Sequence, residues 1–177
     1  MPRRLPPRRR PPPGVSEVSI LLRELFTPAR IKVRVEAEDK DEVFEELVDL
    51  LVTQYRLSSR EEVLDAIRRR EEKMSTGIKR GIAIPHAKTA FTKGVIGVIG
   101  ISKGGIDYQS LDGEPVHLLF LLVSGEADAG LHLAVLKKIA LLVESPDFYE
   151  AVLAAADAEA VYKALNRFEE ILDSQDA

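Results

Sequence analysis

The spacing of apolar positions changes along the chain. Apolar residues recur three and four positions apart in the first third and again after residue 130, whereas in the centre they form short runs between glycines. Spacing near 3.6 residues indicates amphipathic helices, and short apolar runs bounded by glycine indicate strands. The pattern therefore predicts helices, then a sheet, then helices.

The first third predicts one strand between helices. Helical spacing at 16–25 ends at a Thr-Pro pair, and residues 31–35 alternate apolar and basic side chains as a half-buried strand does. Two longer helices follow at about 39–54 and 59–73, and each opens with a capping-box pattern. The paired residues of these patterns are Asp39 with Glu42 and Ser59 with Glu62.

The remainder predicts the sheet and its second helical layer. Strands are expected at 82–84, 95–101 and 116–123. A helix at 131–143 is apolar almost all round and should be largely buried, and a last helix carries its apolar face between residues 161 and 172. This order predicts an α/β fold, a mixed β-sheet with helices on both faces.

The N-terminus differs in composition from the rest. Residues 1–13 hold five arginines, no acidic residue and six of the ten prolines. We expect a disordered Arg/Pro-rich arm at 1–14 and one domain at 15–177. The arm is interpreted either as a basic tether for an anionic partner, or as a dispensable tail or the product of a translational start placed too far upstream. The usual behaviour of chain termini favours the second interpretation.

Charge, hydropathy and cysteine content argue against several classes of function. The net charge is −4, and residues 14–177 carry 20 basic against 29 acidic groups, a net −9. An acidic body argues against a nucleic-acid partner. No apolar run approaches the ~20 residues that cross a bilayer, so we expect no integral membrane protein. The chain has no cysteine, which fits a cytoplasmic location.

His86 is the leading candidate for chemistry. It follows the apolar segment 81–85, which ends in Pro85, so its imidazole should leave the end of a strand on a rigid backbone. A neutral imidazole is a competent nucleophile near pH 7. A buried structural histidine is the alternative.

The wide spacing of His86, His117 and His132 does not fit a zinc site, so neither a metal nor another cofactor is expected.

Donors suited to a phosphoryl group precede His86. Arginines at 68–70 close the preceding helix, and Ser75, Thr76 and Gly77 lie between that helix and the strand. Guanidinium, hydroxyl and backbone N–H groups all bind phosphate oxygens. A favourable interaction with the helix C-terminus would also explain the arginines.

These residues resemble a known family. Residues 70–86, REEKMSTGIKRGIAIPH, are similar to the active-site segment of type-2 enzyme IIA domains of the bacterial phosphoenolpyruvate:sugar phosphotransferase system, the fructose, mannitol and nitrogen-regulatory members. The resemblance continues through GIDY at 105–108, LDGEPVHLLFLL at 111–122 and His132, and covers roughly 16–173. It implies an α/β sandwich with a mixed sheet.

The resemblance also implies a role for each site residue. His86 would be the phosphohistidine, which accepts phosphate from an HPr-like phosphocarrier protein and passes it to a IIB domain or holds it as a nitrogen or carbon regulatory signal. Arg70 would bind the phosphoryl oxygens. His132 would hydrogen-bond the phosphate or the His86 ring, so both Arg70 and His132 should approach His86.

Three positions depart from the family pattern, and one histidine is expected to lie outside the site. Ala87 stands where members usually have glycine, and a left-handed backbone there would be strained. Lys79 and Arg80 replace small residues or a Gly-Asn pair, which indicates either extra positive charge at the site or solvated surface charge. His117 lies within a predicted strand, where alternation favours a structural role.

The sequence leaves two functions open. The first is phosphoryl transfer through His86, a phosphotransferase activity. No IIB or IIC segment is evident in the chain, which favours the nitrogen-regulatory branch over a sugar permease subunit. The second is a regulatory binding module that does not transfer phosphate and docks a transporter or kinase through the His86 face.

Overall fold

The computed structural model describes residues 20–175. The predicted arm at 1–14 and the start of the predicted helix at 16–25 lie outside them. The described helices are α1 (Leu22–Leu25), α2 (Lys40–Tyr55), α3 (Arg60–Lys73), α4 (Ala129–Val143), α5 (Pro146–Ala154) and α6 (Ala158–Gln175), with short 3-10 helices η1 (Pro28–Arg30) and η2 (Glu126–Asp128). None of these helices combines the length and the apolar character needed to cross a membrane.

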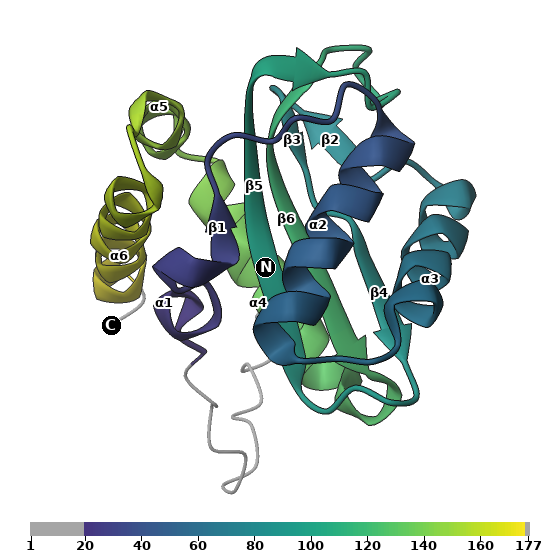
Figure 1. The fold of residues 1–177 in the computed structure, drawn as a ribbon. Helices are drawn as coiled ribbons and strands as arrows, with labels where there is room; N and C mark the ends of the chain where they lie inside the picture. The colour runs from purple at the N-terminus through teal and green to yellow at the C-terminus, as the bar shows by residue number, and fades with distance from the viewer. Residues whose placement is uncertain (1–19, 176–177) are drawn as a thin grey trace, which may run out of the picture.

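A mixed six-stranded sheet forms the centre of the protein (Figure 1). Its strands are β1 (Ile31–Lys32), β2 (Gly77–Lys79), β3 (Ile82–Ala83), β4 (His86–Thr89), β5 (Val95–Ile106) and β6 (Val116–Gly125). The order is β1-β5-β6-β3-β2, and β4 also pairs with β6. Strands β5 and β6 are antiparallel, whereas β3 and β4 run parallel to β6.

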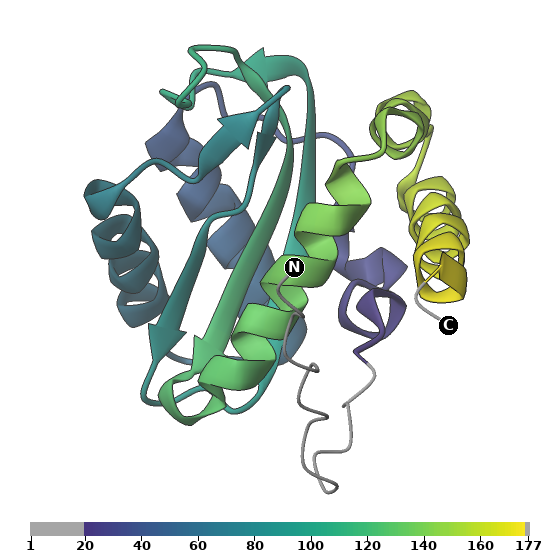
Figure 2. The same cartoon turned by 180° about the vertical axis from the view of Figure 1, so that it is seen from behind.

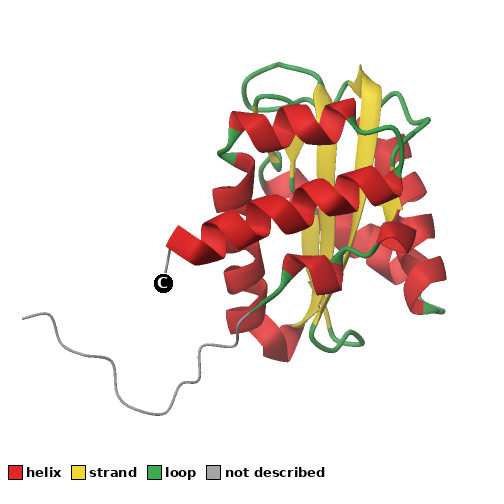
Figure 3. Ribbon diagram, turned by 90° about the vertical axis from the view of Figure 1, so that its left-hand side faces the viewer, coloured by secondary structure: helices red, strands yellow, loops and turns green. Residues whose placement is uncertain are grey.

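Helices cover both faces of the sheet. Helices α2 and α3 lie in front of the strands in Figure 1, and α4 lies behind them, as the reverse view in Figure 2 shows. Figure 3 shows the side of the molecule on which α6 runs across the strand direction. Alternate residues of β6 supply the two cores: Leu118, Phe120 and Leu122 face α4, whereas Leu119, Leu121 and Val123 face α2 and α3. The predicted fold class is confirmed.

The two long N-terminal helices form where predicted, but their caps differ. The Asp39 carboxylate accepts from Glu42 N at 2.9 Å, while the Glu42 side chain accepts from Glu38 N rather than from Asp39 N. Ser59 makes no side-chain cap bond, so the capping box predicted there is wrong. Helix α3 still forms because its apolar face, Val63 to Ile67, packs against the sheet.

Other boundaries differ from the expectation because pairing and packing decide them. Strands β2 and β4 were missed: they are short and not apolar, and they form by pairing with β3 and β6. Helix α4 is not buried all round. Leu133 is 68% exposed and Leu141 41% exposed, because only one face of α4 packs on the sheet.

Candidate functional site

The backbone at the start of β4 fixes the His86 ring. His86 is the first residue of β4 and pairs with Leu122, and the preceding Pro85 carbonyl accepts from Leu122 N at 3.0 Å. The His86 Nδ1 lies 2.7 Å from the Ile84 carbonyl oxygen. Because a carbonyl oxygen only accepts, Nδ1 carries the proton, and the neutral ring keeps its lone pair on Nε2.

His132 lies against His86. It belongs to the first turns of α4 and is 5% exposed. The centroids of the two imidazole rings are 5.3 Å apart, and the ring planes are tilted by 53°. His132 Nδ1 shares a 2.7 Å hydrogen bond with the hydroxyl of Ser124, which is fully buried in β6. The sheet therefore fixes both rings.

Both histidines line an open pocket of about 700 Å³. Its lining side chains include Arg69, Arg70, Lys73, His86, Lys88, Glu126, His132 and Leu136. Four cations thus face one carboxylate. The Arg70 guanidinium lies in the same pocket as His86, where its Nη1 donates to the Met74 carbonyl at 3.2 Å. The site suits an anion.

Burial and neighbouring cations keep both rings neutral at pH 7. Burial lowers the pKa of His86, the Ile84 hydrogen bond acts in the opposite direction, and Arg70 lowers the pKa further. Burial, followed by His86, Lys88 and Arg70, lowers the pKa of His132 to about 4. A neutral His86 retains the lone pair that a nucleophile needs.

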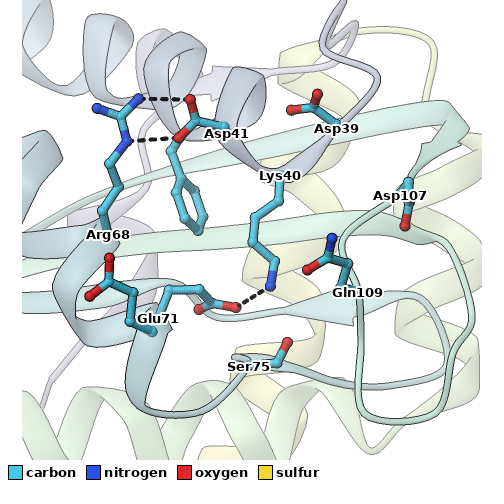
Figure 4. Close-up of a pocket in the computed structure, with 10 residues that line it drawn as sticks. Asp39, Lys40, Asp41, Arg68, Glu71, Ser75, Asp107 and Gln109 are labelled. Atoms are coloured by element: carbon cyan, nitrogen blue, oxygen red, sulfur yellow. Dashed lines mark hydrogen bonds and ion pairs between the residues drawn. The ribbon is translucent and has the colours of Figure 1, made fainter.

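The Ser75 to Gly77 segment faces away from this pocket. Ser75 lines a second pocket, with Asp39, Lys40 and Gln109 (Figure 4). Thr76 is 6% exposed, and both its N–H and its hydroxyl donate to Glu71. The expectation that these donors bind phosphate on His86 therefore has no support in the structure, because Glu71 already uses those of Thr76.

Two further basic groups of the sequence argument also lie elsewhere. Arg68 pairs with Asp41 through two bonds, of 2.7 and 2.9 Å, and lines the second pocket (Figure 4). Lys79 and Arg80 are exposed at the turn between β2 and β3. The adjacent Gly81 carbonyl accepts from His117 N in β6, whereas His86 pairs with Leu122, five residues further along the same strand. At about 3.3 Å per strand residue, the turn is therefore about 17 Å from His86. Solvated surface charge was therefore the correct alternative.

The remaining departures are also resolved. Ala87 is buried in β4, and its backbone is not left-handed. Within residues 20–175, the non-glycine residues with positive φ are Arg56, Arg80 and Gln109. The strain expected at Ala87 is absent. His117 donates from Nδ1 to the Ser102 carbonyl at 2.9 Å, which fits the structural role expected for it.

The pocket offers no evident place for a metal ion. Within residues 20–175, no group of three or more histidine or carboxylate side chains is placed to hold one. The two histidines are surrounded by arginine and lysine, which repel cations.

Sequence reasoning missed several pocket residues. Lys88 alternates with buried Ala87 and Thr89 in β4, so recognising that strand would have found Lys88. Lys73 lies three residues after Arg70, at the end of the same helix, and was not singled out either. Ser124 carries no local signal, because its role depends on the packing of α4 onto β6.

Comparison with known proteins identifies the class. The family described as "Phosphoenolpyruvate-dependent sugar phosphotransferase system, EIIA 2" matches residues 24–168. The protein belongs to this EIIA family, which confirms the resemblance found in the sequence.

Both branches of the family occur among its relatives. It is 38% identical over 144 residues to the fructose-specific EIIABC component of Bacillus subtilis, a match that covers 81% of this chain but only 23% of that protein. It is 32% identical to the nitrogen regulatory protein of Pseudomonas aeruginosa, covering 81% of this chain and 94% of that one. The crystal structure of nitrogen regulatory protein IIA-Ntr from Neisseria meningitidis superposes with a TM-score of 0.77 at 32% identity, covering 82% and 99% of the two chains.

Proposed function

We propose that the protein is a phosphoryl carrier whose His86 accepts a phosphoryl group on Nε2 from a phosphorylated HPr-like carrier protein. The observation that carries the proposal is the bond from His86 Nδ1 to the Ile84 carbonyl, inside a pocket of four cations. That bond leaves the Nε2 lone pair as the nucleophile of the neutral ring.

The transfer step forms one bond and breaks one bond. The Nε2 lone pair forms the N–P bond as the bond between phosphorus and the carrier breaks, and the electron pair of that bond stays with the carrier. The ring gains positive charge, which the Ile84 carbonyl stabilises through the Nδ1–H bond. Arg70, in the same pocket, would stabilise the phosphoryl oxygens, and neutral His132, whose ring centroid lies 5.3 Å from that of His86, would hydrogen-bond the phosphate or the His86 ring.

The functions named for the relatives suggest two kinds of protein that could act on phosphorylated His86. The fructose-specific relative supports transfer to a IIB domain, and the nitrogen regulatory relatives support a regulatory protein that responds to the phosphorylation state of His86. Either acceptor would use the same phosphohistidine.

The test is incubation with a phosphorylated HPr-type carrier, followed by measurement of intact mass. Wild type should gain the mass of one phosphoryl group, labile in acid, and His86→Ala should gain none. His117→Asn is the matched control, because this histidine lies outside the pocket, and it should be labelled like wild type. A wild type that stays unlabelled would favour the binding module that does not transfer phosphate.

A further inference from the structure

We propose that Glu71 is a positioning residue that holds both His86 and Arg70 through the turn formed by residues 74–76. The proposal rests on the proposed role of His86. Glu71 follows Arg70 in α3, yet its side chain is turned away from the His86 pocket and lines the second pocket (Figure 4). Its influence on the reaction is therefore indirect.

The Glu71 carboxylate is buried and fully engaged. The residue is 8% exposed. Its oxygens accept from Thr76 N at 3.0 and 3.1 Å and from the Thr76 hydroxyl at 2.6 Å, and they pair with Lys40 Nζ at 3.0 Å. Tyr108 shares a 2.7 Å hydrogen bond with the same hydroxyl. A buried carboxylate with this many donors holds its partners in one geometry.

One chain of hydrogen bonds runs from Thr76 to the His86 ring. The Thr76 carbonyl accepts from Ile84 N at 3.0 Å, and the Ile84 carbonyl accepts from His86 Nδ1 at 2.7 Å. The backbone of Ile84, whose carbonyl receives the His86 bond, is thus held by Thr76, and Thr76 is held by Glu71. A shift of Thr76 would weaken the bond that keeps the proton on Nδ1 and the lone pair on Nε2.

A second, shorter path leads from the same turn to Arg70. The Arg70 Nη1 donates to the Met74 carbonyl, two residues before Thr76. Because α3 ends at Lys73 and Met74 is already extended, the position of that carbonyl depends on how the turn is held. One carboxylate therefore fixes the nucleophile and the cation that face the phosphoryl group.

The experiment uses the full chain with ¹⁵N-labelled histidine and compares Glu71→Gln with wild type. The ring nitrogen shifts of His86 should report an Nδ1–H tautomer in wild type and a mixture of tautomers in the variant. The kcat for phosphoryl transfer should fall about 10- to 100-fold, with a smaller change in KM for the carrier, because the pocket surface is unaltered. Glu72→Gln, an exposed neighbour, is the charge-matched control and should behave as wild type.

A second pair of variants keeps the proposal falsifiable if Glu71→Gln fails to fold. Thr76→Val removes the hydroxyl that Glu71 holds and should shift the tautomer and lower kcat, whereas Thr76→Ser should restore both. Unchanged His86 ring shifts and kcat in a folded Glu71→Gln, or in Thr76→Val, would overturn the proposal. The ring shifts need no phosphate, so they decide the role of Glu71 even if wild type accepts no phosphoryl group.

Discussion

At the scale of single residues, the site consists of two neutral imidazoles among fixed cations. His86 and His132 lie with ring centroids 5.3 Å apart, and two protonated rings at this distance would repel each other. The low pKa values of both histidines prevent this near pH 7. The positive charge of the pocket then comes from its arginine and lysine side chains.

The depressed pKa of His132 predicts a pH-dependent stability. The unfolded chain protonates this histidine near its ordinary pKa of 6.5, whereas the folded protein resists protonation until about pH 4. The stabilisation is therefore fully present above pH 6.5, is lost as the pH falls from 6.5 to 4, and does not change further below that. The loss should reach at most about 3 kcal/mol.

His132→Asn isolates this effect, since asparagine can keep a hydrogen bond to Ser124 and does not titrate. Urea unfolding of both proteins at several pH values should show the wild type losing more stability than the variant between pH 7 and pH 4. Parallel curves for the two proteins would show that His132 is not held neutral by the fold.

Single residues also show what a local motif can and cannot predict. His86 and Arg70 were identified from residues 70–86 because that motif is local, and the structure places both in one pocket. The assignment of Ser75 to Gly77 as phosphate ligands had the same local basis, but it neglected the competition from buried Glu71 for the donors of Thr76. Which donors remain free depends on tertiary contacts.

At the scale of elements, the turn between β2 and β3 has an unfavourable backbone conformation at Arg80. Arg80 has φ of 55° and Gly81 has φ of 76°, so two successive residues adopt the left-handed conformation. Glycine adopts it freely, whereas a residue with a Cβ pays about 1 to 2 kcal/mol. The Arg80 side chain is exposed, and its backbone N–H already donates to Asp112.

Arg80→Gly should therefore raise the free energy of unfolding. Glycine also increases the entropy of the unfolded chain, which offsets part of this gain, so the net increase should be about 0.5 to 1 kcal/mol. The measurement is urea denaturation at pH 7. Lys79→Gly is the control: Lys79 is extended in β2, so glycine there should destabilise the protein. A variant at Arg80 that is no more stable than wild type would contradict the account of this turn.

Elements with strong periodicity were predicted well, and those formed by pairing were not. The long strands β5 and β6 and the helices α2, α3 and α6 each carry enough apolar residues to specify their own class. Strand β4 has the sequence His-Ala-Lys-Thr and exists because β6 offers a free edge beside it. The strand that carries His86 was thus the hardest to predict.

At the scale of the whole molecule, an acidic body carries one basic pocket. Residues 14–177 have a net charge of −9, yet the His86 pocket is lined by Arg69, Arg70, Lys73 and Lys88. A basic pocket on an acidic surface attracts a phosphorylated partner to the face that carries the pocket, whereas the rest of the surface repels anions.

Neutralising Arg69 and Lys73 together, by Arg69→Gln and Lys73→Gln, should slow association with the phosphorylated carrier by about tenfold at low salt, with little change in kcat. Stopped-flow kinetics at two ionic strengths measure this, and added salt should reduce the difference. Lys79→Gln with Arg80→Gln removes the same charge at the far end of the sheet and should have a much smaller effect. Equal effects of the two pairs would show that net charge, not the pocket, governs association.

The most direct measurement is the identity of the phosphorylated atom. The protein, labelled with ¹⁵N in its histidines, is phosphorylated by an HPr-type carrier, and coupling between ³¹P and ¹⁵N identifies the bonded ring nitrogen by NMR. The Ile84 hydrogen bond predicts a single phosphoryl group on Nε2 of His86, with Nδ1 still protonated. A phosphoryl group on Nδ1, on His132 or on no histidine would contradict the central claim.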